Sequence, residues 1–304
     1  MNTVWLLAPD LTLIAIGFVL YRSYFRDQAF WPVLEKLTYF VLFPALLFAT
    51  VSRTPLRAAE AGTTLVAVLG AVAAGIALGY LAKPVLQADA RQFASGVQCA
   101  FRFNSYVFLA LSHRLAGEAG VSLAAVIIGI AVPPINVAAV WPLARNSGGG
   151  FVKELARNPL LLATVGGLLF NLLGLRLPEL AENTLLRLGS ASLVLGLLSA
   201  GAGLRLGALA ERDAAVRART LTLAAWFLAV KLIAMPLVAF TLTQLLALPP
   251  VPAQIAVAYA ALPTAPAAYI LASRMGGDGA FVAMLVSATL IASALALPFW
   301  IALV

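Results

Sequence analysis

Two polar side chains stand inside an apolar stretch that could form part of a membrane helix. Residues 98–111 read QCAFRFNSYVFLAL and carry Arg102 and Asn104 near their middle. A charge at the centre of a bilayer costs at least about 2.5–3.5 kcal/mol on insertion scales, so it normally faces a partner or a hydrated cavity. The planar guanidinium of arginine can donate two parallel hydrogen bonds to a carboxylate, and an asparagine adds a neutral donor and acceptor. These residue types predict a site for a small organic anion.

A second unusual stretch lies late in the chain. Residues 261–272 read ALPTAPAAYILA, with Pro263 and Pro266 where an unbroken helix would accept neither. When the chain is shifted so that Asn104 falls on Thr264, the two stretches superimpose and Arg114 falls on Arg274. We interpret the stretches as interrupted helices from two related halves of one chain. A simple proline kink is the alternative for the second stretch.

The composition excludes a soluble domain. The 304 residues are 62% hydrophobic and 11% charged, whereas soluble domains average about 45–50% apolar and about 25% charged residues. The net charge of +8 is better explained by basic cytoplasmic loops than by nucleic-acid binding. Cys99 is the single cysteine, and the sequence has no metal-ligand spacing or phosphate-binding loop. The sequence therefore predicts a polytopic membrane protein that is not an enzyme and needs no metal or cofactor.

Ten segments have the length and hydrophobicity of a membrane span, for which about 20 mostly apolar residues suffice. They are residues 4–21, 33–51, 61–81, 92–112, 121–142, 158–174, 184–204, 219–245, 251–273 and 279–303. A glycine-rich run at 146–150 separates the fifth from the sixth span. We predict a first five-helix repeat at 1–143, a cytoplasmic linker at 144–157 and a second, inverted repeat at 158–304. The expected fold is all-α, with broken helices 92–112 and 251–273 crossing near the midplane.

The basic residues predict the orientation. The loops after the odd-numbered spans hold Arg22, Arg26, Lys83, Arg91, Arg145, Lys153, Arg157, Arg205, Arg212, Arg217, Arg219 and Arg274. The loops after the even-numbered spans hold Arg53, Arg57, Arg114, Arg176 and Arg187. Because cytoplasmic loops collect Lys and Arg, the odd-numbered loops are expected in the cytoplasm and both termini outside it.

Three basic residues fall within the spans: Lys36, Arg102 and Lys231. Lys36 lies one turn into its span and can extend to the cytoplasmic surface. Of the 12 acidic residues, Asp10 alone falls where it could reach inward, and it also suits the first turn of a helix. Two central cations and at most one acid leave positive charge that an anionic substrate would neutralise. For Arg102 we favour the anion site over a buried ion pair. For Lys231 both interpretations, and a role in coupling or as a substitute for a bound cation, remain open.

Further polar and helix-breaking residues complete the predicted site. Asn136 follows Pro133 and Pro134, a pair expected to break the span 121–142. Thr264 and Tyr269 offer hydroxyl groups beside the prolines of the second stretch. The predicted substrate-binding set is Arg102, Asn104, Asn136, Thr264 and Tyr269, and the predicted breaks are at Phe103, Ser105, Pro133, Pro134, Pro263 and Pro266.

The chain resembles the auxin efflux carrier family, in its short bacterial form, over its whole length. The resemblance rests on FVLFPALLF (40–48), AFRFNSY (100–106), PPINV (133–137), NPLLLATVGG (158–167), LSAGAGLRL (198–206) and LPTAPAAYILASRMGGD (262–278). It implies a crossover of the fourth and ninth spans and a scaffold of the first, second, sixth and seventh spans. A moving transport unit would lie beside this scaffold, often in a homodimer.

The resemblance also implies a substrate class and a location. Bacterial members are permeases for malonate, malate or similar acids in the plasma (inner) membrane, and plant members export auxin. Plant members have a proline at the fourth-span crossover, where this chain has Phe103-Asn104-Ser105, and a long cytoplasmic loop that this chain lacks. We therefore expect an organic carboxylate, moved by elevator-type alternating access, without specifying auxin.

Two other functions are compatible with the sequence. A sodium-coupled organic-anion symporter of bile-acid-carrier type would need an acidic or carbonyl cage beside the crossover, and the acids are missing. A membrane receptor could bind the same ligand without moving it, although no soluble signalling domain is visible in the sequence. Uptake into liposomes would separate these functions from carboxylate transport.

Overall fold

The regular elements of the computed structural model are helices, and the model describes residues 3–25, 30–53, 58–146, 159–203 and 213–304. The predicted linker 144–157 lies almost wholly outside these ranges. The helices are α1 (Thr3–Ser23), α2 (Phe30–Leu37), η1 (Thr38–Leu42), α3 (Phe43–Arg53), α4 (Ala58–Leu86), α5 (Ala90–Gly96), η2 (Val97–Ala100), α6 (Ser105–Asn146), α8 (Pro159–Leu172), α9 (Glu179–Gly203), α10 (Ala214–Ala229), η4 (Val230–Ala234), α11 (Met235–Leu245), α12 (Pro250–Ala261), α13 (Ala267–Arg274) and α14 (Gly279–Ala302).

The predicted class, an all-helical membrane protein, is confirmed. Five stretches of the described chain are helices long and apolar enough to cross a membrane. They are Phe30–Arg53, Gly62–Leu86, Val126–Arg145, Ala214–Leu245 and Gly279–Ala302. Other predicted spans are shorter helices in the structure, such as the 14-residue α8. The ten-span, two-repeat arrangement stays a prediction.

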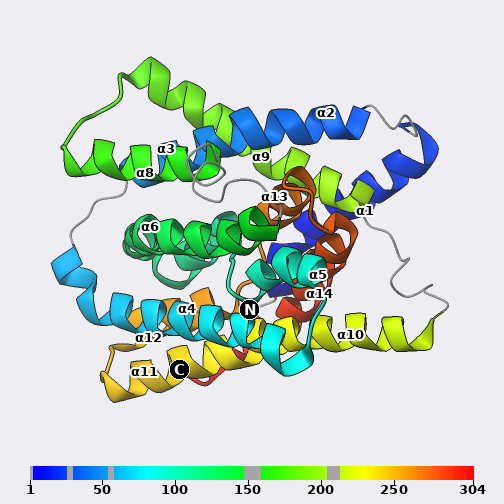
Figure 1. Ribbon diagram of the computed structural model, residues 1–304. Coiled ribbons are helices and arrows are strands. Elements are labelled where there is room, and N and C mark those ends of the chain that lie inside the picture. The colour runs from blue at the N-terminus through cyan, green and yellow to red at the C-terminus, as the bar shows by residue number, and fades with distance from the viewer. Residues whose placement is uncertain (1–2, 26–29, 54–57, 147–158, 204–212) are drawn as a thin grey trace.

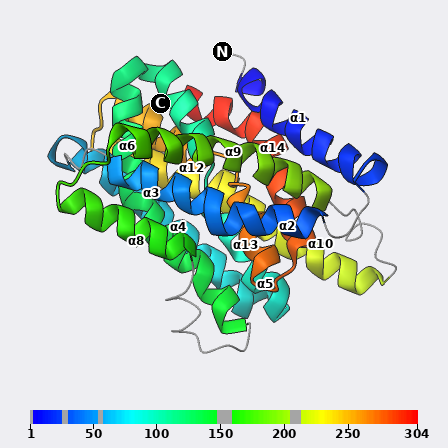
Figure 2. The ribbon, with the colours of Figure 1, turned by 90° about the horizontal axis from the view of Figure 1, so that it is seen from above.

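The helices form two groups, and Figure 1 shows α2, α3, α8 and α9 of one group above the other group, while α1 runs obliquely down to the N-terminus. The outer layer consists of α1, α2, α3, α8 and α9, in which α1 packs against α9, and α3 packs against α8 and α9. The main body consists of α4, α5, α6 and α10 to α14, in which α11 packs against α4 and α12. Figure 2, seen from above, places the outer layer in front of the main body and α1 beside α14.

Glycines allow helices to approach closely within both groups. A methyl group on Gly75 of α4 would lie 2.6 Å from the Met235 sulfur of α11. A methyl group on Gly79 would lie 3.1 Å from Ala100 Cβ of η2. In the outer layer, Gly201 of α9 packs directly on the backbone of Ile14 in α1. Small residues are the usual means of close helix approach in membranes.

Aromatic side chains replace backbone donors that prolines remove. Pro236 has no N–H, so the carbonyl of Leu232, four residues earlier, loses its helical donor. The indole Nε1 of Trp300 donates to that oxygen at 2.9 Å. In the same way the Tyr80 hydroxyl donates at 2.7 Å to the carbonyl of Ala138, four residues before Pro142. Both carbonyls are thus satisfied in a region where lipid would offer no water.

The expected break at Pro133 and Pro134 is wrong. Both prolines lie inside α6, which continues through them. A proline removes one helical hydrogen bond and has a backbone angle that a helix accepts, so a membrane helix can continue through it. The non-helical angles within α6 lie at Ala116 and Gly117, between the predicted spans 92–112 and 121–142, and Gly117 has φ of 58°.

Candidate functional site

Two non-helical segments lie against each other in the main body. Residues 101–104 separate η2 from α6, and residues 262–266 separate α12 from α13. The Asn104 backbone N–H donates to the Pro263 carbonyl at 3.0 Å, and the Thr264 hydroxyl donates to the Cys99 carbonyl at 2.9 Å. We call this pair of segments the crossing. Each segment therefore satisfies backbone groups that the other leaves without a helical partner.

Local sequence explains both segments. Leu262 precedes Pro263 and has extended backbone angles, φ −61° and ψ 150°, as expected for a residue before proline. In the first segment no proline is present, and the Asn104 side chain starts the next helix. Its Oδ1 accepts from the Val107 N–H at 3.3 Å, which is the contact of a helix N-cap.

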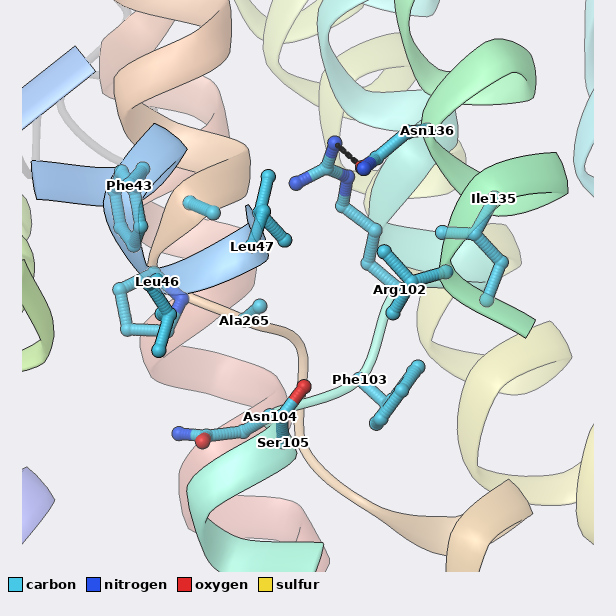
Figure 3. A pocket seen from close by; sticks show the side chains of 13 residues that line it. Phe43, Leu46, Leu47, Arg102, Phe103, Asn104, Ser105, Ile135, Asn136 and Ala265 are labelled. Carbon is cyan, nitrogen blue, oxygen red and sulfur yellow. Dashed lines mark hydrogen bonds between the residues drawn. The ribbon is translucent and has the colours of Figure 1, made fainter. Parts of the chain in front are cut away.

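A cavity of about 70 Å³ lies between the crossing, α3 and α6. Its volume is enough for several water molecules. The lining residues are Phe43, Leu46, Leu47, Arg102, Phe103, Asn104, Ser105, Val132, Ile135, Asn136, Ala265, Pro266 and Ala267. Figure 3 shows these side chains, with α3 on one side and Asn136 and Ile135 of α6 on the other.

Two helices begin at this cavity. Ser105 is the first residue of α6 and Ala267 is the first residue of α13, and both line it. The N-terminus of a helix is the positive end of the helix dipole, which favours an anion. The backbone thus contributes positive potential from two directions.

Arg102 adds a full positive charge to the same cavity. Its side chain is 4% exposed, and its Nη2 donates to Asn136 Oδ1 at 2.9 Å (Figure 3). Its Nε has no hydrogen-bond partner among the described residues. The observed partner of the guanidinium is thus a neutral amide, and the structure shows no carboxylate against it within the described part of the chain. A ligand carboxylate would be held by the N–H groups that remain.

The cavity brings together six of the predicted site and break residues: Arg102, Phe103, Asn104, Ser105, Asn136 and Pro266. Thr264 and Tyr269 are buried outside its lining. The Thr264 hydroxyl is already bonded to Cys99, and its backbone N–H donates to Thr289 Oγ1 at 3.2 Å. For these two residues, substrate binding stays a prediction to which the geometry adds no support.

The remaining predicted residues lie elsewhere. Lys231 is fully buried in η4, away from the cavity lining, and donates to the Ala260 carbonyl at 3.0 Å. Lys36 is exposed at the end of α2, consistent with a surface position. Asp10 lies in α1, but its side chain is outside the described part of the structure.

Sequence reasoning missed the apolar wall of the cavity. Phe43, Leu46 and Leu47 of α3 face Ile135 of α6 across it, and Val132 of α6 also lines it. The run 40–48 is apolar throughout, so nothing in it separates a cavity-facing from a lipid-facing residue. Gln98 was also missed; its buried Nε2 bonds the Ser95 and Ala268 carbonyls at 3.0 and 3.2 Å.

A comparison of the chain with known protein families adds to this geometry. The family model described as membrane transport protein matches residues 139–301 of the chain. This stretch is more than half of the 304 residues and includes the second segment of the crossing. No curated protein matches the chain.

Proposed function

Because the chain belongs to the auxin efflux carrier family of membrane transport proteins, we propose that it carries an organic carboxylate bound at Arg102. The observation on which the proposal depends is a buried guanidinium that opens into a cavity and is paired with a neutral amide. A buried cation without a counter-ion is costly, and a bound carboxylate would remove that cost. The N-terminal ends of α6 and α13 would stabilise the same negative charge.

The lining favours one carboxylate group on an apolar body. Arg102 is the basic residue of the lining, and Lys231 is bonded elsewhere. A dicarboxylate such as malonate or malate would place a second negative charge among Phe43, Leu47 and Ile135, where a charge is poorly solvated. We therefore rank monocarboxylates with an apolar body above malonate and malate as substrates of this chain.

The arrangement suggests how the carboxylate would move. We propose ten spans in two inverted repeats, with the outer layer as scaffold and the main body as transport unit. The cavity has one wall on α3 of the outer layer and the other on the crossing and α6 of the main body. Sliding of the main body along α3 would carry the bound anion across the membrane and expose it on each side in turn. We place both termini outside the cytoplasm, in the inner membrane of a bacterium.

The two rivals have less support. A sodium-coupled symporter would need an acidic or carbonyl cage beside the crossing, and the described residues contain no group of three or more His, Cys, Asp or Glu that could supply an acidic one. A receptor without transport is disfavoured by membership of a transporter family. Uptake of the ligand by liposomes containing the purified protein distinguishes transport from binding alone.

Thermal unfolding of the purified protein tests the site. We expect benzoate to raise the melting temperature in proportion to the logarithm of its concentration above saturation, malonate to act less, and neutral benzamide not to act. Arg102→Ala should abolish the benzoate effect, because about 1.5–3 kcal/mol per charge-assisted hydrogen bond is lost. Arg114→Ala is the matched control, since Arg114 is an exposed arginine on α6, the helix that follows Arg102 in the chain. A benzoate effect that survives Arg102→Ala, or an equal effect of benzamide, would refute this site.

A further inference from the structure

The ammonium group of Lys231 lies in the interior of the main body. Lys231 belongs to the π-helical turn η4 between α10 and α11, and its side chain is fully buried. Its Nζ donates to the Ala260 carbonyl at 3.0 Å, with the Met235 sulfur 4.0 Å away. No carboxylate pairs with it among the side chains that the structure describes. The charge of Lys231 is therefore balanced by backbone oxygen.

The Ala260 carbonyl is available because the chain leaves the helix two residues later. Ala260 is the penultimate residue of α12. In a continuous helix its oxygen would accept the N–H of Thr264, four residues on, but that N–H donates to Thr289 Oγ1 at 3.2 Å. Pro263, between them, has no N–H to offer. The end of α12 thus presents to Lys231 an oxygen that has no helical donor, together with the negative end of a helix dipole.

Such helix ends are where secondary transporters bind their coupling cation. Unwound carbonyls and half-helix C-terminal ends coordinate sodium or receive protons in carriers built on interrupted helices. Here a tethered ammonium already occupies that position, at the end of α12, and residues 262–266 separate it along the chain from the start of α13 at the anion cavity. Its distance to the Ala260 oxygen, 3.0 Å, is that of a normal N–H···O hydrogen bond.

We propose that Lys231 takes the place of a bound cation at the C-terminal end of α12, so that carboxylate binding by this carrier needs no coupling cation there. This proposal rests on the proposed function, because it assigns the fixed charge of Lys231 to a protein that is a carboxylate carrier. Lys231 acts through α12 and is a positioning residue, since it does not line the cavity. Loss of its side chain would leave an empty cation site.

The test measures the melting temperature of the unaltered protein and of its variants as the concentration of sodium, lithium or methylammonium is raised. Choline replaces the cation so that the ionic strength stays constant. For the unaltered protein we expect no difference between sodium and choline. For Lys231→Ala we expect a lower melting temperature in choline and a saturable recovery of about 3–6 °C in one of the small cations. Lys36→Ala is the matched control, because Lys36 is an exposed lysine, and it should respond like the unaltered protein.

A second readout separates this role from simple packing. The benzoate affinity of Lys231→Ala should be at least about 10-fold weaker in choline and should recover with the small cation, because the fixed charge is restored. If Lys231 only filled space, the benzoate affinity of Lys231→Ala would be the same in choline and in the small cation. Lys231→Arg, which keeps the charge, should not acquire cation dependence.

The outcomes separate this inference from the proposed function. A saturable sodium effect on the unaltered protein, or no cation effect on Lys231→Ala, overturns the inference even if benzoate binds at Arg102. Absence of any carboxylate effect on the unaltered protein overturns the proposed function, while the cation titration without carboxylate still tests Lys231. If Lys231→Ala does not fold, the comparison of sodium with choline on the unaltered protein remains decisive.

Discussion

The backbone N–H of Asn104 donates to the carbonyl oxygen of Pro263 at 3.0 Å, joining two segments that lie far apart in the chain. A second bond, from the Thr264 hydroxyl to the Cys99 carbonyl at 2.9 Å, joins the second segment to η2, which precedes the first. In a continuous helix the Cys99 oxygen would accept the N–H of Phe103, but Phe103 is not helical. The crossing is therefore held by bonds that replace helical ones.

Thr264→Val should destabilise the protein by about 1–3 kcal/mol, because it leaves the buried Cys99 carbonyl without a donor while almost preserving volume. Thr241→Val is the matched control. Thr241 is exposed and bonds the Leu237 carbonyl within its own helix, so its replacement should change the free energy of unfolding by less than about 0.5 kcal/mol. Equal losses for the two variants in denaturant or thermal unfolding would contradict this role of Thr264.

Asn136→Asp should abolish carboxylate binding. The new carboxylate would face Arg102 Nη2 in place of the amide oxygen that now lies 2.9 Å away, and it would neutralise the cavity from within. The melting temperature without ligand should not fall, since the buried guanidinium acquires a counter-ion. Asn136→Ala, which leaves the positive charge free, should keep the benzoate effect. Retention of that effect by Asn136→Asp would show that charge is not what binds the ligand.

Trp300→Phe should destabilise the protein by about 1–3 kcal/mol, because the Leu232 carbonyl loses the indole donor that replaces the missing N–H of Pro236. In a Pro236→Ala background the same substitution should cost less, since alanine restores a backbone donor four residues after Leu232. A double-mutant cycle on the free energy of unfolding measures this coupling. Additive effects would mean that the two groups do not serve the same oxygen.

Gly201→Ala should destabilise the outer layer by about 1–3 kcal/mol. A methyl group there would press on the Ile14 carbonyl of α1, which is backbone and cannot rotate away. Gly62→Ala in α4 is the control, because no atom lies within 4 Å of the added carbon and alanine is the better helix former. We expect Gly62→Ala to leave the melting temperature unchanged or raise it. A similar loss in both variants would exclude close packing as the cause.

The sequence predicted the polar part of the cavity because polar residues are rare in apolar segments. Arg102, Asn104 and Asn136 were each conspicuous for this reason, and all three line one cavity. The apolar lining was not predictable, since Leu46 and Leu47 look the same whether they face lipid, a neighbouring helix or a ligand. Thr264 was assigned to substrate because its bond to Cys99 depends on tertiary structure.

The prolines also show that the local sequence does not determine where a helix is interrupted. Pro263 lies in a non-helical segment, whereas Pro133 and Pro134 lie within α6. Each lacks the same N–H, so the local sequence predicts a break equally at both places. At Pro263 the crossing partner accounts for the difference, because Asn104 donates to its carbonyl. Lys231 likewise had several open interpretations, and its bond to the Ala260 carbonyl depends on tertiary structure.

The crossing can form only after both of its segments have been synthesised. A polypeptide that has grown only to residue 146 contains the Cys99 carbonyl and the Asn104 N–H, but not the groups of Thr264 and Pro263 to which they bond. The bilayer offers no water to take their place. When the first half has been synthesised, the Cys99 carbonyl and the Asn104 N–H therefore lack their partners. They gain them only when residues 262–266 have been synthesised and have packed against them.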